Sequence, residues 1–321
     1  MTEVAKAGVA RADAPPPPPP DGRPSGPGAR VGRFTPYLFL APYLLLFGAF
    51  GLLPIILGGW ISLHQWDFQL DNKPFVGLDN YQEFFDSESL VFDDWWESVR
   101  ATGIFTLLSV PLLVVLPLGL ALLLNRSFPG RTFFRAVYFA PYVLGVAVVG
   151  LLWRFLLDAN LGLVNQLLGA VGLPSDTPWV TDVPWAWVSL VGVTVWWTSG
   201  FNAVIYLAGL QDIPRELYEA AEMDGATRWE RFRHVTLPGL RPVLLFVLTT
   251  TLIASASLFG QSYLITQGAP GDQTRSVVWY IVERGLGQND AGRAAAMSIL
   301  LTLLLAVVSV VNFRIFRYRE D

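Results

Sequence analysis

The charged side chains with a motif-like spacing lie in one polar stretch, Glu216–Pro238, between two long apolar runs. Just before it, Asp212 and Pro214 are typical of a helix start, because a carboxylate caps free backbone N–H groups and the fixed φ of proline suits a first turn. The predicted helix ends at Gly225, since glycine readily adopts the left-handed conformation that closes a helix. An ordinary connection between two apolar runs does not need this degree of local structure.

A second short helix is predicted to follow at once. Thr227 and Glu230 have the T-x-x-E spacing of a capping box, in which each residue bonds a backbone N–H group of the other. This helix is expected to end at Leu237-Pro238, before the next apolar run. The first limb is acidic and the second carries Arg228, Arg231 and Arg233. The chemistry that such side chains offer is ionic contact with another surface.

The residue order in this stretch matches a known motif. Glu219-Ala220-Ala221 is followed after three residues by Gly225, after nine more by Val235, and one residue later by Leu237-Pro238. This order resembles the EAA loop of importer-type ABC permeases, which prefers isoleucine where Val235 stands. The resemblance implies that residues 211–241 form a coupling loop whose helix inserts into a cleft of a partner ATPase, with the coupling residues Glu219, Ala220, Ala221, Asp224, Gly225, Leu237 and Pro238. The alternative is an amphipathic helix pair that rests on the membrane surface.

Several kinds of catalytic and metal site are excluded by residue content. The chain has no cysteine, and its histidines are His64 and His234, so thiolate and histidine-rich metal sites are ruled out. Its lysines, Lys6 and Lys73, lie outside any G-x-x-x-x-G-K-[ST] motif, so the chain has no P-loop. We therefore predict no catalytic residue, metal or cofactor here, and a separate ATPase subunit that binds any ATP used. The net charge of −4 does not suggest nucleic-acid binding.

The composition is that of a membrane protein. Apolar residues make up 53% of the chain, charged residues 15%, and the mean hydropathy is +0.45. Prolines within the apolar runs, including Pro111, Pro117 and Pro141, suggest kinks. We predict an all-α membrane protein with one transmembrane domain over residues 35–321. Its six transmembrane helices, each long enough to cross about 30 Å of hydrocarbon, lie near residues 37–63, 101–124, 136–157, 184–210, 242–265 and 294–316.

The basic residues around the apolar runs predict the orientation. With six crossings, most arginines fall on the side of the coupling loop, whereas the connection over residues 64–99 is acidic. We therefore predict a multi-pass protein of the cytoplasmic membrane with both termini and the coupling loop in the cytoplasm. Residues 1–34 include the run Pro15–Pro20 and are expected to form a disordered cytoplasmic tail, because this composition cannot bury a core.

Three further segments resemble carbohydrate permeases of the maltose and glycerol-phosphate type. Phe75–Tyr81 matches the pattern F-x-G-L-x-N-Y, and Gly162–Asn165 matches G-x-x-N. Thr266–Pro270 matches T-x-G-G-P except that Ala269 replaces the second glycine. The resemblance implies a permease subunit that imports a sugar or oligosaccharide by alternating access. It also implies a second homologous permease, an ABC ATPase dimer and an extracytoplasmic solute-binding protein as partners in the lipid bilayer.

Polar and aromatic side chains in the fourth and fifth runs suit a path for a sugar, because hydroxyls and amides bond a polyol and aromatic faces pack on its C–H groups. The candidates are Trp197, Asn202, Ser255, Ser257, Gln261 and Tyr263. Helix–helix packing is the alternative role for each of them. The central parts of the runs hold no ionisable residue, which favours an uncharged solute. The alternatives left open are import of a glycerol-phosphate-like polyol or an amino acid, an ion-coupled carrier, and a structural membrane scaffold.

Overall fold

The computed structural model describes residues 35–317, and the side chains of residues 37–315. This part of the chain is helical and contains no β-strand, only two isolated bridges, His64 with Phe75 and Asp67 with Asp290. The predicted all-α fold is confirmed. The proline-rich segment 1–34 lies outside the described residues, so its disorder remains a prediction.

The chain divides into two units, Met1–Pro54 and Ile55–Asp321. The described part of the first unit consists of α1 (Thr35–Phe47), a π-helical turn (Gly48–Leu52) and the start of α2 (Leu53–Ile61). None of its described side chains is buried within the chain. The combined helix is apolar and long enough to cross a membrane, as the first predicted span requires.

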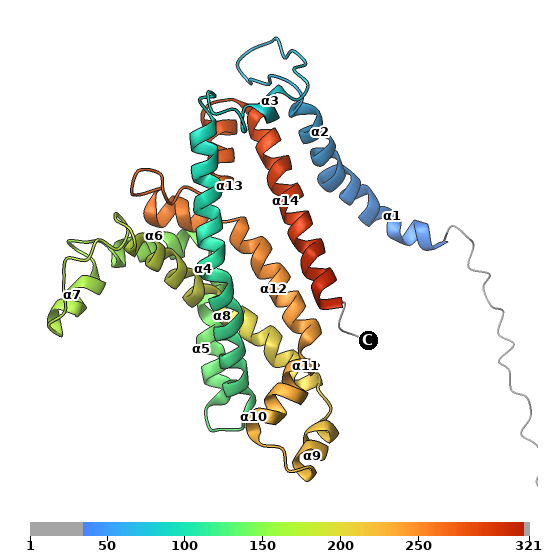
Figure 1. Cartoon of the computed structure of the whole chain (residues 1–321), viewed down its shortest axis with the longest axis vertical. Helices are drawn as coiled ribbons and strands as arrows, with labels where there is room; N and C mark the ends of the chain where they lie inside the picture. The colour runs from blue at the N-terminus through green and yellow to red at the C-terminus, as the bar shows by residue number, and fades with distance from the viewer. Residues whose placement is uncertain (1–34, 318–321) are drawn as a thin grey trace, which may run out of the picture. The chain divides into compact units, whose positions relative to one another are not determined.

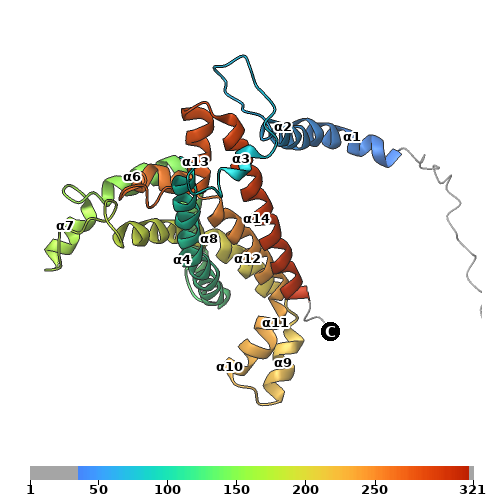
Figure 2. The ribbon, with the colours of Figure 1, turned by 45° about the horizontal axis from the view of Figure 1, so that its top comes forward.

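The second unit is built around two long helices, α4 (Phe92–Asn125) and α8 (Trp185–Asp212), which pack along each other. α12 (Arg241–Ala256) packs against both, and α14 (Ala291–Arg317) packs against α12. Helices α9, α10 and α11 lie at one end of this bundle, and α3 and α13 lie at the other (Figure 1). The rotated view in Figure 2 shows the same separation of the two ends.

The third predicted span is sharply bent. It consists of α5 (Arg131–Val143) and α6 (Val146–Leu156), which meet at 96°. The bend follows Pro141, one of the prolines predicted to kink a span, whereas α4 continues through its prolines. The described residues contain four helices long and apolar enough to cross a membrane, and up to six if each of two bent pairs is one span. The second pair joins Arg228–Gly239, which belongs to the predicted coupling loop, to α12 at 67°.

Short helices and π-helical turns occupy the connections. The α-helices are α3 (Asp79–Gln82), α7 (Leu163–Ala170), α9 (Arg215–Met223), α10 (Arg228–Arg231), α11 (Leu237–Gly239) and α13 (Val277–Val282), and the π-helical turns are Phe232–Thr236, Ser262–Thr266 and Glu283–Gly287. The fifth span differs from its predicted extent. Its helix α12 ends at Ala256, and the chain is helical again from Gly260.

One polar contact shows how α4 accommodates a proline in its interior. Pro117 has no N–H group, so it cannot donate to the carbonyl of Leu113, four residues earlier. Asn202 of α8 donates its side-chain N–H to this carbonyl at 3.0 Å, and also approaches Thr251 Oγ1 of α12 at 3.3 Å. Asn202 therefore satisfies the carbonyl that Pro117 leaves free and joins three helices.

Candidate functional site

The first limb of the predicted coupling loop is α9, which follows α8 directly. Asp212 is the last residue of α8, and Pro214 stands at the N-cap of α9 without a side-chain capping bond. The prediction that Asp212 caps the new helix is therefore wrong. The prediction for Gly225 is confirmed: its φ is +79°, and the next N–H group, that of Ala226, donates to the carbonyl of Ala221 at 2.9 Å.

The second limb begins with the predicted capping box. Glu230 Oε2 accepts from the backbone N–H of Thr227 at 2.7 Å, and Thr227 Oγ1 accepts from the backbone N–H of Glu230 at 3.3 Å. The hydrogen bond that the carboxylate accepts from the Thr227 backbone, together with the contribution of the Thr227 side chain, holds the pKa of Glu230 below its ordinary value. The limb then runs through a π-helical turn and continues past Leu237-Pro238 to Gly239, slightly beyond the predicted end.

Two side-chain contacts hold the limbs together. The hydroxyls of Tyr218 and Thr236 are 3.0 Å apart, and Arg231 forms an ion pair with Glu222 at 3.3 Å. Sequence reasoning missed Tyr218 and Thr236, although both are adjacent to motif residues. Because nothing in the sequence indicates which side chains of the two limbs meet, this pairing follows from the structure alone.

The predicted coupling residues lie on an exposed surface. The carboxylates of Glu219 and Asp224 are exposed, and neither has a hydrogen bond or ion pair within the described part of the chain. Ala220 and Leu237 are also exposed, and Ala221 and Pro238 are half-buried. Large apolar side chains accompany them, since 88% of Met223, 66% of Trp229 and 51% of Leu217 is exposed. Exposed apolar groups among free carboxylates are characteristic of a protein-docking surface.

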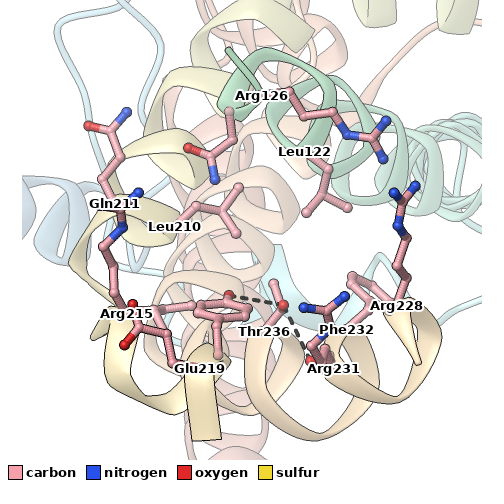
Figure 3. A pocket seen from close by; sticks show the side chains of 13 residues that line it. Leu122, Arg126, Leu210, Gln211, Arg215, Glu219, Arg228, Arg231, Phe232 and Thr236 are labelled. Atoms are coloured by element: carbon pink, nitrogen blue, oxygen red, sulfur yellow. Dashed lines mark hydrogen bonds between the residues drawn. The ribbon is translucent and has the colours of Figure 1, made fainter. Parts of the chain in front are cut away.

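A pocket of about 1090 Å³ lies between the coupling loop and the adjacent ends of α4 and α8 (Figure 3). Its lining residues are Leu122, Asn125, Arg126, Leu210, Gln211, Ile213, Arg215, Tyr218, Glu219, Arg228, Arg231, Phe232 and Thr236. Among them, Glu219, a predicted coupling residue, is the one acidic side chain. Four arginines make the pocket strongly basic.

A second cavity, of about 290 Å³, lies between α4, α5, α8 and α12. Four of the predicted path residues line it: Trp197, Asn202, Ser255 and Gln261. Asn202 bonds the carbonyl of Leu113, Ser255 bonds Ser109 at 3.1 Å, and Trp197 donates to the carbonyl of Leu144 at 3.1 Å. The Gln261 side chain has no hydrogen-bond partner within the described part of the chain, so its amide is available to a ligand.

The structure does not bring the other two path residues to this cavity. Ser257 is exposed just beyond the end of α12. Tyr263 lines a separate cavity of about 600 Å³, where it stacks on Phe259 and meets Trp279 edge-on. Both residues lie beyond the end of α12 at Ala256, as does Gln261, which does line the cavity.

At the opposite end of the bundle from the coupling loop, ion pairs join segments distant in sequence. Arg275 is 7% exposed at its side chain and bonds Asp94 at 2.7 Å. Arg293 forms a two-pronged pair with Glu83, with one contact of 2.9 Å, and pairs with Asp290 at 2.8 Å. Sequence reasoning missed these residues. A basic residue in a loop indicates its own charge, but not the acid that it meets.

The model of the family described as "Binding-protein-dependent transport system inner membrane component" matches residues 90–320. The chain belongs to this family. It is therefore a multi-pass membrane subunit of a binding-protein-dependent transport system, as the EAA-like loop indicated. Full-length relatives agree with this assignment.

One relative is the trehalose/maltose transport system permease protein MalF of Thermococcus litoralis, 34% identical over 89% of this chain and 94% of that protein. Another is the arabinooligosaccharides transport system permease protein AraP of Bacillus subtilis, 33% identical over 88% of each chain. A crystal structure of a bacterial ABC transporter involved in the import of the acidic polysaccharide alginate has a TM-score of 0.76 at 24% identity, covering 91% of this chain and 98% of that one. This similarity confirms the predicted fold, that of an ABC importer permease.

Proposed function

We propose that this permease moves a sugar or oligosaccharide, delivered by an extracytoplasmic binding protein, through the cavity lined by Trp197 and Gln261. One observation carries the proposal: the residues that line the cavity include aromatic rings, hydroxyls and amides but no charged side chain. Its volume of about 290 Å³ is at the lower end of the range for small-molecule sites. The relatives named for trehalose, maltose and arabinooligosaccharides support the same class of solute.

The alternative solutes fit this lining less well. A phosphorylated polyol or a zwitterionic amino acid needs a charged partner when it leaves water, because burial of an unpaired charge is costly. An ion-coupled carrier needs an ionisable group in the membrane. Neither requirement is met by the lining of this cavity.

The partners that we propose are a second homologous permease, an ABC ATPase dimer and the binding protein. The ATPase docks on the coupling loop through Glu219, Asp224 and the exposed apolar side chains beside them, and Gly225 permits the turn between the limbs. Ala220, Ala221, Leu237 and Pro238 complete the docking segment. ATP binds to the partner ATPase and this chain performs no catalysis, so it uses no cofactor of its own. Both termini and the coupling loop lie in the cytoplasm, as the arginine distribution favours.

Coupling is tested by co-purification of the ATPase with this permease. Glu219→Ala and Gly225→Asp are expected to lower ATPase retention or solute-stimulated ATP hydrolysis. Glu216→Ala is the matched control, because Glu216 is exposed on the same helix but lies outside the motif. If both motif variants retain and stimulate the ATPase like the wild type, the loop is only a surface helix pair.

The solute path is tested separately with Gln261→Leu in proteoliposomes that contain the complete importer. We expect the variant to assemble normally and to keep basal ATP hydrolysis, while uptake of labelled sugar falls. Maltose, trehalose and an arabinooligosaccharide are suitable probes. Equal uptake by Gln261→Leu and the wild type for every transported sugar would remove Gln261 from the path.

A further inference from the structure

The pocket beside the coupling loop is here called the basic pocket. Not all of its arginines are paired with an acidic side chain. Arg231 is paired with Glu222. The guanidinium groups of Arg126 and Arg228 have no hydrogen bond or ion pair within the described residues. Figure 3 shows their guanidinium groups extending toward the same side of the pocket, whereas Glu219 lies on the other side with Arg215. Two unpaired guanidinium groups that share one side of a pocket are suited to bind an anion.

The position of the pocket in the fold sets its depth in the membrane. It lies where two spans end, at Asn125 of α4 and Asp212 of α8. Residues that end a span lie at the level of the lipid headgroups. Arginines at this depth meet phosphates of the adjacent leaflet, and basic pockets between membrane helices bind anionic headgroups.

The lining of the pocket is divided between apolar and charged side chains. Leu122, Leu210 and Ile213 form an apolar wall, and Ile213 is buried in the same core cluster as Leu210. Arg126 and Arg228 supply charge from α4 and from α10. A soluble anion gains nothing from the apolar wall, and an acidic protein side chain has no long apolar group to place against it. An amphiphilic molecule can place its apolar part against the wall and its anionic part against the arginines.

We propose that the basic pocket binds the phosphate of an anionic phospholipid, with Arg126 and Arg228 on the phosphate and the apolar wall against the glycerol and first acyl carbons. The bound phosphate bridges the end of α4 and the second limb of the coupling loop. Anionic lipid therefore helps to hold the loop in place against the bundle. This inference depends on the membrane character of the chain and not on which solute it carries.

The test measures binding of phosphatidylglycerol to the complete importer in phosphatidylcholine nanodiscs, by native mass spectrometry. Arg126→Gln and Arg228→Gln are each expected to weaken phosphatidylglycerol binding about five-fold, because each removes one cation from the headgroup site. Arg233→Gln is the matched control: Arg233 is exposed on the same limb, lies outside the pocket and has no partner in the described part of the chain. Phosphatidylcholine is expected not to occupy the site.

Three results would overturn the proposal. The first is that the pocket variants retain as much phosphatidylglycerol as the wild type, or that Arg233→Gln loses as much as they do. The second is that inorganic phosphate displaces the lipid, which would identify a site for a free anion. The third is that the pocket variants lose the ATPase while lipid binding is unchanged, which would identify the arginines as contacts for an acidic protein surface. Because Arg126 and Arg228 are exposed, the variants are expected to fold. Arg228→Lys, which keeps the charge, is expected to bind more lipid than Arg228→Gln.

Discussion

Replacement of Gly200 by alanine is expected to force α5 away from α8. A Cβ atom at this position would lie 1.9 Å from the carbonyl oxygen of Tyr138 and 2.9 Å from Cα of Phe139. Both are backbone atoms, so no side-chain rotation relieves the clash. To bring the oxygen contact to 3.0 Å, the closest that real Cβ atoms show, the two helices must separate by about 1 Å.

The consequences of this separation are both energetic and functional. Overpacking of a close helix contact costs about 1–3 kcal/mol. The same crossing holds Tyr142 of α5 stacked on Phe201 of α8, with ring centroids 4.4 Å apart, and both rings line the cavity of about 290 Å³. We therefore expect Gly200→Ala to unfold a few degrees below the wild type and to transport less labelled sugar.

The assay combines thermal unfolding of the purified complex with uptake in proteoliposomes. Gly192→Ala is the control, because Gly192 lies in the same helix and a Cβ there would meet nothing within 4 Å. If Gly200→Ala unfolds and transports like the wild type, the close approach of α5 to α8 is not a constraint and the reasoning fails. Equal losses of stability and uptake in both variants would show that the effect comes from placing alanine in α8 and not from the contact of α8 with α5.

Three further predictions concern single contacts. Arg293→Glu is expected to destabilise the protein by about 1 kcal/mol because it breaks the half-exposed pair with Glu83 and the pair with Asp290. The double reversal with Glu83→Arg is expected to restore part of the loss in unfolding temperature, since the new carboxylate would still face Asp290, and no recovery at all would contradict a direct pair with Glu83. Thr227→Ala removes the capping box and is expected to cost about 1 kcal/mol, measured as faster hydrogen exchange at the Glu230 amide, whereas unchanged exchange would show that the cap is dispensable. Asn202→Leu leaves the Leu113 carbonyl without its donor and is expected to cost about 1–3 kcal/mol, so an unchanged unfolding temperature would mean that another group replaces the amide.

The features of the coupling loop that depend on near neighbours were predictable from the sequence. A left-handed turn needs glycine at one position, and a capping box needs two residues three apart, so Gly225, Thr227 and Glu230 were identified correctly. The prediction failed locally at Asp212, where α8 continues. Leu210 and Ile213, on either side of that point, are both buried in the core of the bundle, and this packing outweighs the local tendency to begin a new helix.

Pairings between distant residues came from the structure alone. Asn202 is 89 residues from Leu113, and Arg293 is 210 residues from Glu83. The sequence shows that each of these side chains is polar, but polarity does not specify a partner. Likewise, the sequence nominated six path residues, and only the folded chain places four of them around one cavity. The other two, Ser257 and Tyr263, lie outside that cavity.

By itself, then, the sequence determined the helical class, the apolar runs and the glycine turn and capping box between the two limbs, because hydrophobic length and short-range capping are properties of neighbouring residues. Tertiary structure decided the 96° bend of the third span, the ion pairs opposite the coupling loop and the convergence of Arg126 with Arg228 on one pocket. Those features depend on which helices pack together. Packing among membrane helices follows from the fit of whole surfaces and not from the order of residues within one segment.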